Sequence, residues 1–195
     1  MRILFLTAGR LLLMLLLGGA ALPALAAAEA VRDPNWATPI ALDGVPNLFK
    51  VSDGLYRSAQ PTPDGLLALR RMGVRTVIDL REFHNDRAAA KQADLLDDEL
   101  SIQTWHITDD EVVTVMRLLA DPQGGPYLIH CHHGSDRTGL MIAMYRILHQ
   151  HWTTQQALAE MTLGGYGFHP LWQNIIDYLT HADAAALRAR VSGSR

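Results

Sequence analysis

One segment of the 195-residue chain gathers several residues that can do chemistry. Residues 130–139 read His-Cys-His-His-Gly-Ser-Asp-Arg-Thr-Gly, and Cys131 is the only cysteine of the chain. The apolar residues 127–130 predict a short buried strand, and a helix is expected from residue 137 to about residue 149. A loop that enters a helix in this way directs backbone N–H groups toward one point, where the helix dipole also favours an anion.

The residue types in this loop fit the binding of a phosphate group. Gly134 lets the backbone turn and approach an anion closely, and Arg137 offers a planar fork for two oxygens. The same positive field favours the nucleophilic thiolate form of Cys131. We therefore expect Cys131 to attack a phosphorus atom held by Arg137 and by the backbone amides of the loop. A buried structural cysteine is the alternative, but it leaves the coincident glycine, arginine and helix start unexplained.

The loop resembles the signature of a known enzyme family. His130, Cys131, Gly134, Arg137 and Thr138 match the pattern H-C-x2-G-x2-R-[ST] of the cysteine-dependent protein tyrosine and dual-specificity phosphatases. Over about residues 45–182 the chain is similar to exported bacterial tyrosine phosphatases of the cell envelope. The resemblance implies hydrolysis of phosphotyrosine, and in some members phosphoserine and phosphothreonine, through a phosphocysteine intermediate.

The resemblance also implies roles for single residues. Arg137 and the loop amides would stabilise the transferred phosphoryl group, and Thr138 would donate a hydrogen bond to the Cys131 sulfur. The residues that would contact the phosphate are His132, His133, Gly134, Ser135, Asp136, Arg137 and Thr138. His130 would orient the cysteine. No cofactor and no metal are implied. A second enzymatic reading is a phosphoinositide or inositol phosphate phosphatase that uses the same Cys-Arg loop. Sulfur transfer and phosphate binding without catalysis are further alternatives.

The general acid that protonates the leaving group is the open question in this sequence. By resemblance it would be an aspartate upstream, where residues 105–110 lack a clean Trp-Pro-Asp. Asp109 is the first candidate and Asp110 the second, although acids in the first turn of a helix also stabilise it without any catalytic role. Asp136 competes because it lies beside Arg137, and His106 is a weaker candidate.

Some residues outside the loop are candidates for the rim of the site. Arg81, Glu82 and Asp86 follow a predicted parallel strand, at the sheet edge where α/β folds bind ligands. Tyr166 lies in a glycine-rich segment that either borders the pocket or connects two helices with its aromatic residues in the core.

The elements that position these residues alternate between strands and helices. Strands are expected at residues 48–51, 55–57, 74–80, 102–107 and 127–130. Helices are expected at residues 62–73, 87–100, 108–120 and 137–149, with further helices after residue 153. This alternation predicts a single α/β domain over residues 48–190, with a central, mostly parallel, twisted sheet flanked by helices. Residues 29–47 are expected to form an irregular lead-in.

The first 28 residues have the pattern of a secretory signal peptide. Arg2 and Arg10 bracket a short basic region, a leucine run follows at residues 11–17, and small residues after Pro23 suit cleavage. We therefore expect an exported protein, periplasmic or secreted, that meets a membrane only if the segment stays uncleaved as an anchor. Cleavage would remove two of the 17 basic residues, leaving 15 against 20 acidic residues and a net charge of −5.

Composition excludes other classes of protein. The full chain has a formal net charge of −3 and no basic cluster, so a nucleic-acid partner is not expected. A single cysteine excludes an internal disulfide and a multi-cysteine zinc site. The expected partner is a phosphorylated protein substrate, or a phosphorylated lipid or small molecule.

Overall fold

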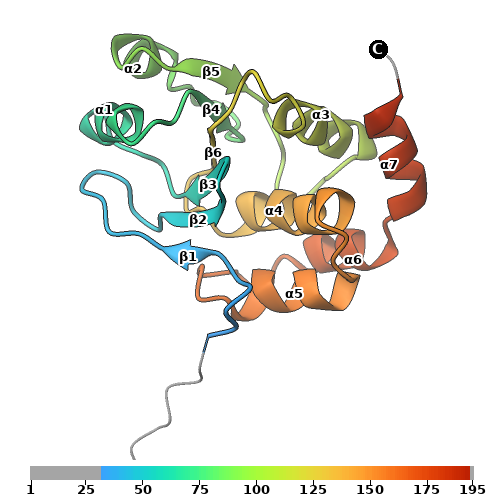
Figure 1. Cartoon of the computed structure of the whole chain (residues 1–195). Coiled ribbons are helices and arrows are strands. Elements are labelled where there is room, and N and C mark those ends of the chain that lie inside the picture. The colour runs from blue at the N-terminus through green and yellow to red at the C-terminus, as the bar shows by residue number, and fades with distance from the viewer. Residues whose placement is uncertain (1–31, 194–195) are drawn as a thin grey trace, which may run out of the picture. The chain divides into compact units, whose positions relative to one another are not determined.

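A six-stranded mixed sheet organises the chain (Figure 1). The structure is a computed structural model that describes residues 32–193, so the predicted signal peptide at residues 1–28 lies outside the described residues. The strands are β1 (Thr38–Pro39), β2 (Phe49–Ser52), β3 (Leu55–Ser58), β4 (Thr76–Asp79), β5 (Leu96–Glu99) and β6 (Tyr127–His130). The helices are α1 (Pro63–Arg71), α2 (Arg87–Gln92), α3 (Asp109–Leu119), α4 (Asp136–His149), α5 (Thr154–Leu163), α6 (Gln173–His181) and α7 (Ala184–Ser192).

The strand order in the sheet is β1-β2-β3-β6-β4-β5. The first three strands pair antiparallel, whereas β3, β6, β4 and β5 pair parallel. The predicted α/β fold with a mostly parallel sheet is thereby confirmed, with an antiparallel meander at one edge. β1 pairs with β2, so the segment expected to be irregular contributes one short strand. The central position of β6 places the end of that strand, and the loop after it, in the middle of the sheet edge.

Each face of the sheet carries its own apolar core, because successive side chains of a strand point to opposite faces. Val77 of β4 and Leu128 of β6 pack with α1 and α2. Ile78 and Ile129, their neighbours in sequence, pack with α3 to α7 on the other face (Figure 1). α4 is the central helix of this second layer, and most of its residues are buried. The start of α4 is therefore held by contacts on nearly all sides.

Three of the seven helices among residues 32–193 begin with the capping residues that the sequence predicts. Thr108 with Glu111, and Thr153 with Gln156, form reciprocal capping boxes at the starts of α3 and α5. Thr62 caps α1, with Pro63 at its first position. Among residues 32–193, no helix combines the length and apolar content needed to cross a membrane.

The predicted helix over residues 87–100 is wrong in its second half, and so is the strand predicted at residues 102–107. α2 ends at Gln92, and the chain then turns through Asp94, which has a positive φ of 57°. Residues Leu96–Glu99 form β5, paired parallel with β4. The alanines and the run Leu-Leu-Asp-Asp-Glu-Leu favour a helix locally, but pairing with β4 overrides that preference. Residues 102–107 form a loop with one isolated bridge between Gln103 and His106.

This edge strand holds partly buried carboxylates. Asp97 and Glu99 lie on one face of β5, and Glu99 stands opposite Asp79 of β4 in the parallel register. Burial and the adjacent charge of Glu99 raise the pKa of Asp97 to about 7. An acid whose pKa is higher in the folded than in the unfolded chain lowers stability as the pH rises between the two values.

We predict that Asp97→Asn stabilises the protein at pH 8 but not at pH 4. The asparagine removes a charge that the folded protein accommodates poorly, and the gain should be about 1 kcal/mol after allowance for solvent screening at a partly buried group. Urea unfolding at the two pH values measures it. Asp43→Asn, at an exposed position, is the control and should leave the pH dependence unchanged. An equal gain at both pH values would contradict the assignment to charge.

Candidate active site

The loop between β6 and α4 presents Cys131 at the carboxyl edge of the sheet. β6 ends at His130 and α4 begins at Asp136, so residues 131–135 form the turn onto a helix N-terminus. Cys131 is only 3% exposed, and His132 and His133 are exposed. The Cys131 thiol thus lies beside the backbone N–H groups at the positive, N-terminal end of α4, a well-packed helix of 14 residues.

Gly134 gives the loop its tight path. Its φ is +68°, and a Cβ built on it would lie 2.4 Å from the backbone carbonyl carbon and oxygen of Ser58. The loop therefore rests directly on the end of β3, and only glycine fits there. Asn47 fixes the loop from outside by donating hydrogen bonds to the carbonyl oxygens of His133 (2.9 Å) and Tyr166 (3.0 Å).

A buried arginine supports the loop from below. Arg57 of β3 is fully buried, and its Nη2 donates a 2.7 Å hydrogen bond to the carbonyl oxygen of Gly134. Its guanidinium lies 3.7 Å from the ring centroid of Tyr166, a cation–π contact. Burial lowers the pKa of Arg57 to about 10, which still leaves it charged at neutral pH. Tyr166 is 2% exposed, so this residue belongs to the core beneath the loop and not to the rim.

A cavity of about 520 Å³ opens above the loop. Its walls come from four places: the segment after β4, the segment between β5 and α3, the loop with the start of α4, and the segment between α5 and α6. The lining residues are Arg81, Glu82, Thr104, His132, His133, Asp136, Arg137, His169, Leu171 and Trp172. Partial burial and the charges of His133, Arg81 and Arg137 lower the pKa of His132. The arginines among these neighbours place positive charge at the mouth of the loop, which favours a bound anion.

Arg137 lies at the floor of this cavity. Its Nη1 donates to the carbonyl oxygens of Leu80 and Ile102, both at 3.2 Å. These two bonds fix the guanidinium between the end of β4 and the loop that follows β5. Arg137 and the loop amides can therefore hold the oxygens of a phosphate group above Cys131.

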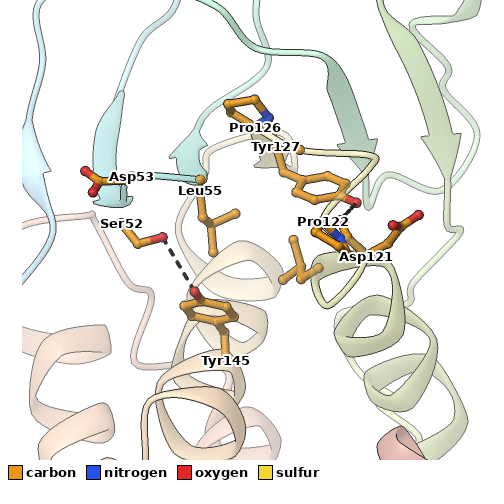
Figure 2. Close-up of a pocket in the computed structure, with 11 residues that line it drawn as sticks. Ser52, Asp53, Leu55, Asp121, Pro122, Pro126, Tyr127 and Tyr145 are labelled. Carbon is orange, nitrogen blue, oxygen red and sulfur yellow. Dashed lines mark hydrogen bonds between the residues drawn. The ribbon is translucent and has the colours of Figure 1, made fainter.

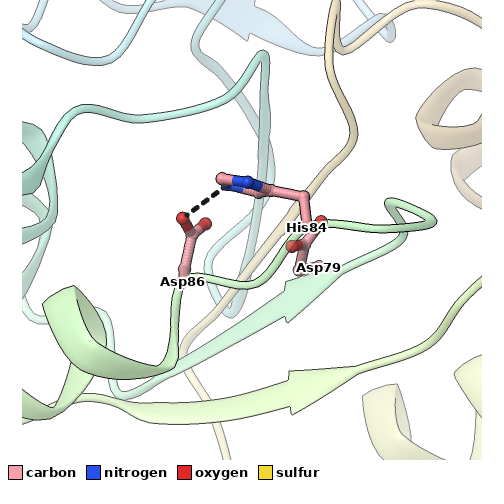
Figure 3. Close-up of side chains that lie close together, drawn as sticks. All are labelled: Asp79, His84 and Asp86. Atoms are coloured by element: carbon pink, nitrogen blue, oxygen red, sulfur yellow. Dashed lines mark hydrogen bonds and ion pairs between the residues drawn. The ribbon is translucent and has the colours of Figure 1, made fainter.

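His130 is anchored by carboxylates on the α1–α2 face of the sheet. Its Nε2 lies 3.0 Å from Oδ2 of Asp86, and its Nδ1 lies 3.9 Å from Oδ1 of Asp79. Figure 3 shows Asp86 also reaching His84, at 3.3 Å. Burial alone would raise the pKa of Asp86, but hydrogen bonds from His130 and Gln60 lower it below its ordinary value. The sequence predicts that Asp86 lies at the rim of the site. In the structure it instead contacts His130 and so supports the catalytic loop from the sheet side.

Asp79, His84 and Asp86 are also a possible ligand group for a metal ion. One ligand atom from each lies within 4.8 Å of the others. Asp86 already accepts hydrogen bonds from Gln60 and contacts His130. These contacts explain why the three residues lie together: Asp79 and Asp86 hold His130 in place next to Cys131.

The acid candidates from the sequence are placed in different surroundings. Asp109 accepts a 2.8 Å hydrogen bond from the Tyr178 hydroxyl and lies 3.6 Å from Arg190. Asp110 pairs with the same arginine. Within residues 32–193, the cavity is lined by Asp136 but not by Asp109, Asp110 or His106. The structure therefore brings Asp136 together with Cys131 and Arg137, and ties the other two aspartates to α6 and α7.

A second cavity, of about 440 Å³, lies at the opposite end of the strands (Figure 2). Leu55 and Tyr127 line it, and these residues begin the strands β3 and β6 that end near the catalytic loop. The Tyr145 hydroxyl faces Ser52 across it at 3.5 Å. Its charged lining residues are Asp53 and Asp121, and within the described part of the chain its lining holds no arginine or histidine like those of the cavity above the catalytic loop.

Comparison with known proteins agrees with this geometry. Residues 34–176 match the family model described as "DSP-PTPase phosphatase fused to NAD+ Kinase". The dual specificity protein phosphatase TpbA of Pseudomonas aeruginosa is 42% identical over 183 residues, which cover 92% of this chain and 83% of TpbA. The chain belongs to the dual-specificity phosphatase family. It is a cysteine-dependent phosphatase, with Cys131 and Arg137 at the positions of the family signature.

Solved structures and a plant relative extend the comparison. A cysteine-to-serine variant of TpbA in complex with phosphotyrosine superposes with a TM-score of 0.74 at 38% identity, over 83% of this chain and 99% of that one. The inositol diphosphatase DSP3 of Arabidopsis thaliana is 30% identical over 122 residues, which cover 58% of this chain and 60% of that protein.

Thr138 of this phosphatase occupies the signature position after the arginine. Its hydroxyl is fully buried and has no hydrogen-bond partner among residues 32–193. A bond from Thr138 to the Cys131 sulfur is not among the contacts of the described residues, so the role implied by the resemblance stays a prediction.

The sequence did not single out four residues of the cavity wall, Thr104, His169, Leu171 and Trp172, and His169 is the titratable one among them. It lies in the irregular segment between α5 and α6 and contacts Asp136. The only sequence signal was a histidine directly after the glycine-rich residues 164–168, and the distance along the chain gave no reason to join it to Asp136.

We predict that Gly134→Ala lowers turnover by at least about 100-fold, because displacing a catalytic loop by about 1 Å has an effect of that size. The added methyl group would overlap the Ser58 carbonyl at a φ that alanine rarely adopts. Phosphate release from an aryl phosphate measures the loss. Gly54→Ala is the matched control, since nothing lies within 4 Å of a Cβ there. Equal activity of the two variants would contradict this account of the loop.

Proposed function

We propose that the chain is a protein phosphatase that hydrolyses phosphotyrosine through a phosphocysteine intermediate, with phosphoserine and phosphothreonine as further substrates. The observation that carries the proposal is the placement of Cys131 and Arg137 on one loop at the start of α4, beneath an open cavity. A thiolate there attacks phosphorus while Arg137 and the loop amides hold the equatorial oxygens. Water then hydrolyses the phosphocysteine and releases phosphate.

The walls of the cavity support an aromatic phosphate in a peptide. Leu171 and Trp172 line it. Phe83 (96% exposed) and Trp105 (60% exposed) directly follow the lining residues Glu82 and Thr104. Large apolar side chains exposed together near a binding site favour an apolar partner, here a tyrosine ring and its neighbours. The solved complex of TpbA with phosphotyrosine supports the same choice.

Hydrolysis of inositol phosphates or phosphoinositides is the second candidate. Arg81, His132 and His133 line the cavity together with Arg137, and such groups suit a substrate with several phosphates. The relatives named inositol diphosphatases support this candidate. Rates on phosphotyrosine peptides and on inositol phosphates, measured with the same preparation, rank the two.

We predict that Cys131→Ser abolishes phosphate release and that Arg137→Lys lowers kcat/KM by about 10²- to 10³-fold. Serine is a far weaker nucleophile in this position, and lysine cannot grip two oxygens. Initial rates on a phosphotyrosine peptide without added metal measure both effects, with thermal unfolding as the control for folding. Activity that survives Cys131→Ser would overturn the phosphocysteine mechanism.

The same proposal includes export to the periplasm or beyond. The leucine-rich segment and the small residues before Glu29 support it. Mass spectrometry of the protein from fractionated cells should find a chain that begins near residue 29 in the exported fraction. A full-length chain that stays in the cytoplasm would contradict export.

A further inference from the structure

The proposed mechanism needs a group that gives a proton to the leaving oxygen and later takes one from water. Asp109 is poorly placed for this. Burial and the hydrogen bond to Asp109 raise the pKa of Tyr178, so the tyrosine stays a donor and keeps the carboxylate as its acceptor. Arg190 lies on the other oxygen, at 3.6 Å. Asp109 thus joins α3 to α6 and α7, away from the cavity lining given above.

Asp136 lies in the cavity, but both of its oxygens are engaged by one residue. Oδ1 accepts a 2.9 Å hydrogen bond from the backbone N–H of His169, and Oδ2 lies 2.8 Å from His169 Nδ1. Asp136 itself is 7% exposed. Because both oxygens are taken up by His169, the Asp136 carboxyl serves to orient that ring. It fixes the tautomer of the imidazole, with the hydrogen on Nδ1, as the aspartate of a catalytic triad does.

His169 is therefore the group whose proton can move. Its side chain is 43% exposed and it lines the cavity with Arg137. None of the hydrogen bonds among residues 32–193 uses its Nε2, so this nitrogen is free for substrate. Imidazole gains and loses a proton near neutral pH, which suits a group that must act first as acid and then as base.

The segment that carries His169 is fixed to the catalytic loop. Ser135 Oγ donates a 2.8 Å hydrogen bond to the carbonyl oxygen of Tyr166. Gly165 and Gly167, both with positive φ, turn the chain on either side of this tyrosine. The ring of His169 also lies 5.4 Å from that of His133, between centroids. Two independent contacts thus hold the His169 segment against the loop that carries Cys131: the Ser135 side chain on the Tyr166 carbonyl, and the ring of His133 beside that of His169.

We propose that His169 is the general acid and base of this phosphatase and that Asp136 is its positioning residue. This inference rests on the proposed function. In the first step the S–P bond forms at Cys131, the P–O bond breaks, and Nε2–H of protonated His169 protonates the departing oxygen. In the second step neutral Nε2 accepts a proton from water, the oxygen attacks phosphorus, and the Cys131 thiolate leaves.

Charges on every side of the imidazole act on this proton transfer. The carboxylate of Asp136 on α4 lies nearest, 2.8 Å from Nδ1 of His169. The remaining charged or titratable groups of the cavity wall are Arg81 and Glu82 after β4, His132 and His133 in the loop, and Arg137 at the start of α4. A bound phosphate adds negative charge and favours the protonated form that the first step needs.

The test compares His169→Asn, Asp136→Asn and Asp109→Asn across a series of aryl phosphates. Asparagine at position 169 keeps a donor for Asp136 but carries no transferable proton. We expect His169→Asn to lower kcat/KM on a phosphotyrosine peptide by about 10²- to 10³-fold. On 2,4-dinitrophenyl phosphate, whose leaving group departs as a stable anion, the loss should stay within about 5-fold.

The pH–rate profile supplies a second readout. His169→Asn should lose the basic limb, Asp136→Asn should move that limb to lower pH, and Asp109→Asn should match the wild type. The inference is overturned if His169→Asn keeps the wild-type dependence on leaving group and pH, or if Asp109→Asn shows the loss instead. Retained activity on the dinitrophenyl ester shows that a variant is folded. Cys131→Ser is assayed alongside. If that variant stays active, the proposed function itself fails. If it is inactive while His169→Asn behaves like the wild type, only the inference about His169 fails.

Discussion

The catalytic loop depends on one buried guanidinium. Arg57 of β3 donates to the carbonyl oxygen of Gly134 and packs against the face of Tyr166. It thereby joins a strand, the loop and the segment after α5, which are far apart in the sequence. A charge so fully removed from water is stable only when its partners are well placed. The cation–π contact and the Gly134 carbonyl meet part of that need, and the nearby Glu160 carboxylate, hydrogen-bonded by Tyr166 at 3.1 Å, adds a favourable charge. The path of the catalytic loop and the position of the segment after α5 both depend on these contacts of Arg57.

The sheet separates two kinds of support for the nucleophile. On the α1–α2 face, polar groups hold His130: Asp79, Asp86 and, through Asp86, Gln60 and His84. On the other face, α4 packs among apolar helices and brings Asp136 and Arg137 to the loop. Cys131 follows the strand between these two environments. The cysteine is therefore positioned by the backbone of β6 and α4, while the groups that handle phosphate and protons come from neighbouring segments.

Local rules account for much of the fold and for the nucleophile. Several features depend only on residues that are close in the sequence. They are the loop from His130 to Thr138, the helix caps at Thr108 and Thr153, and the apolar strand at residues 127–130. Two features are not local. Residues Leu96–Glu99 become a strand only because β4 offers a partner, against their own helical preference. The pairing of Asp136 with His169 joins positions 33 residues apart, and the burial of Tyr166 depends on Arg57 and on the packing of α5. Periodicity and spacing describe neither kind of contact, so the His169 side of the rim could not be derived from the sequence. Arg81 and Glu82, which directly follow β4, could be, and both line the cavity.

The two edges of the sheet have a consequence for association between chains. β1 has only two residues, one of them Pro39, which has no N–H to offer a second strand. At the other edge β5 reads Leu-Asp-Asp-Glu, and carboxylates along an edge repel the strand of another copy. Asp97 thus lowers the stability of the fold while helping to keep neighbouring molecules apart. In acid, where these groups take up protons, that repulsion weakens, and the edge becomes more open to pairing between chains.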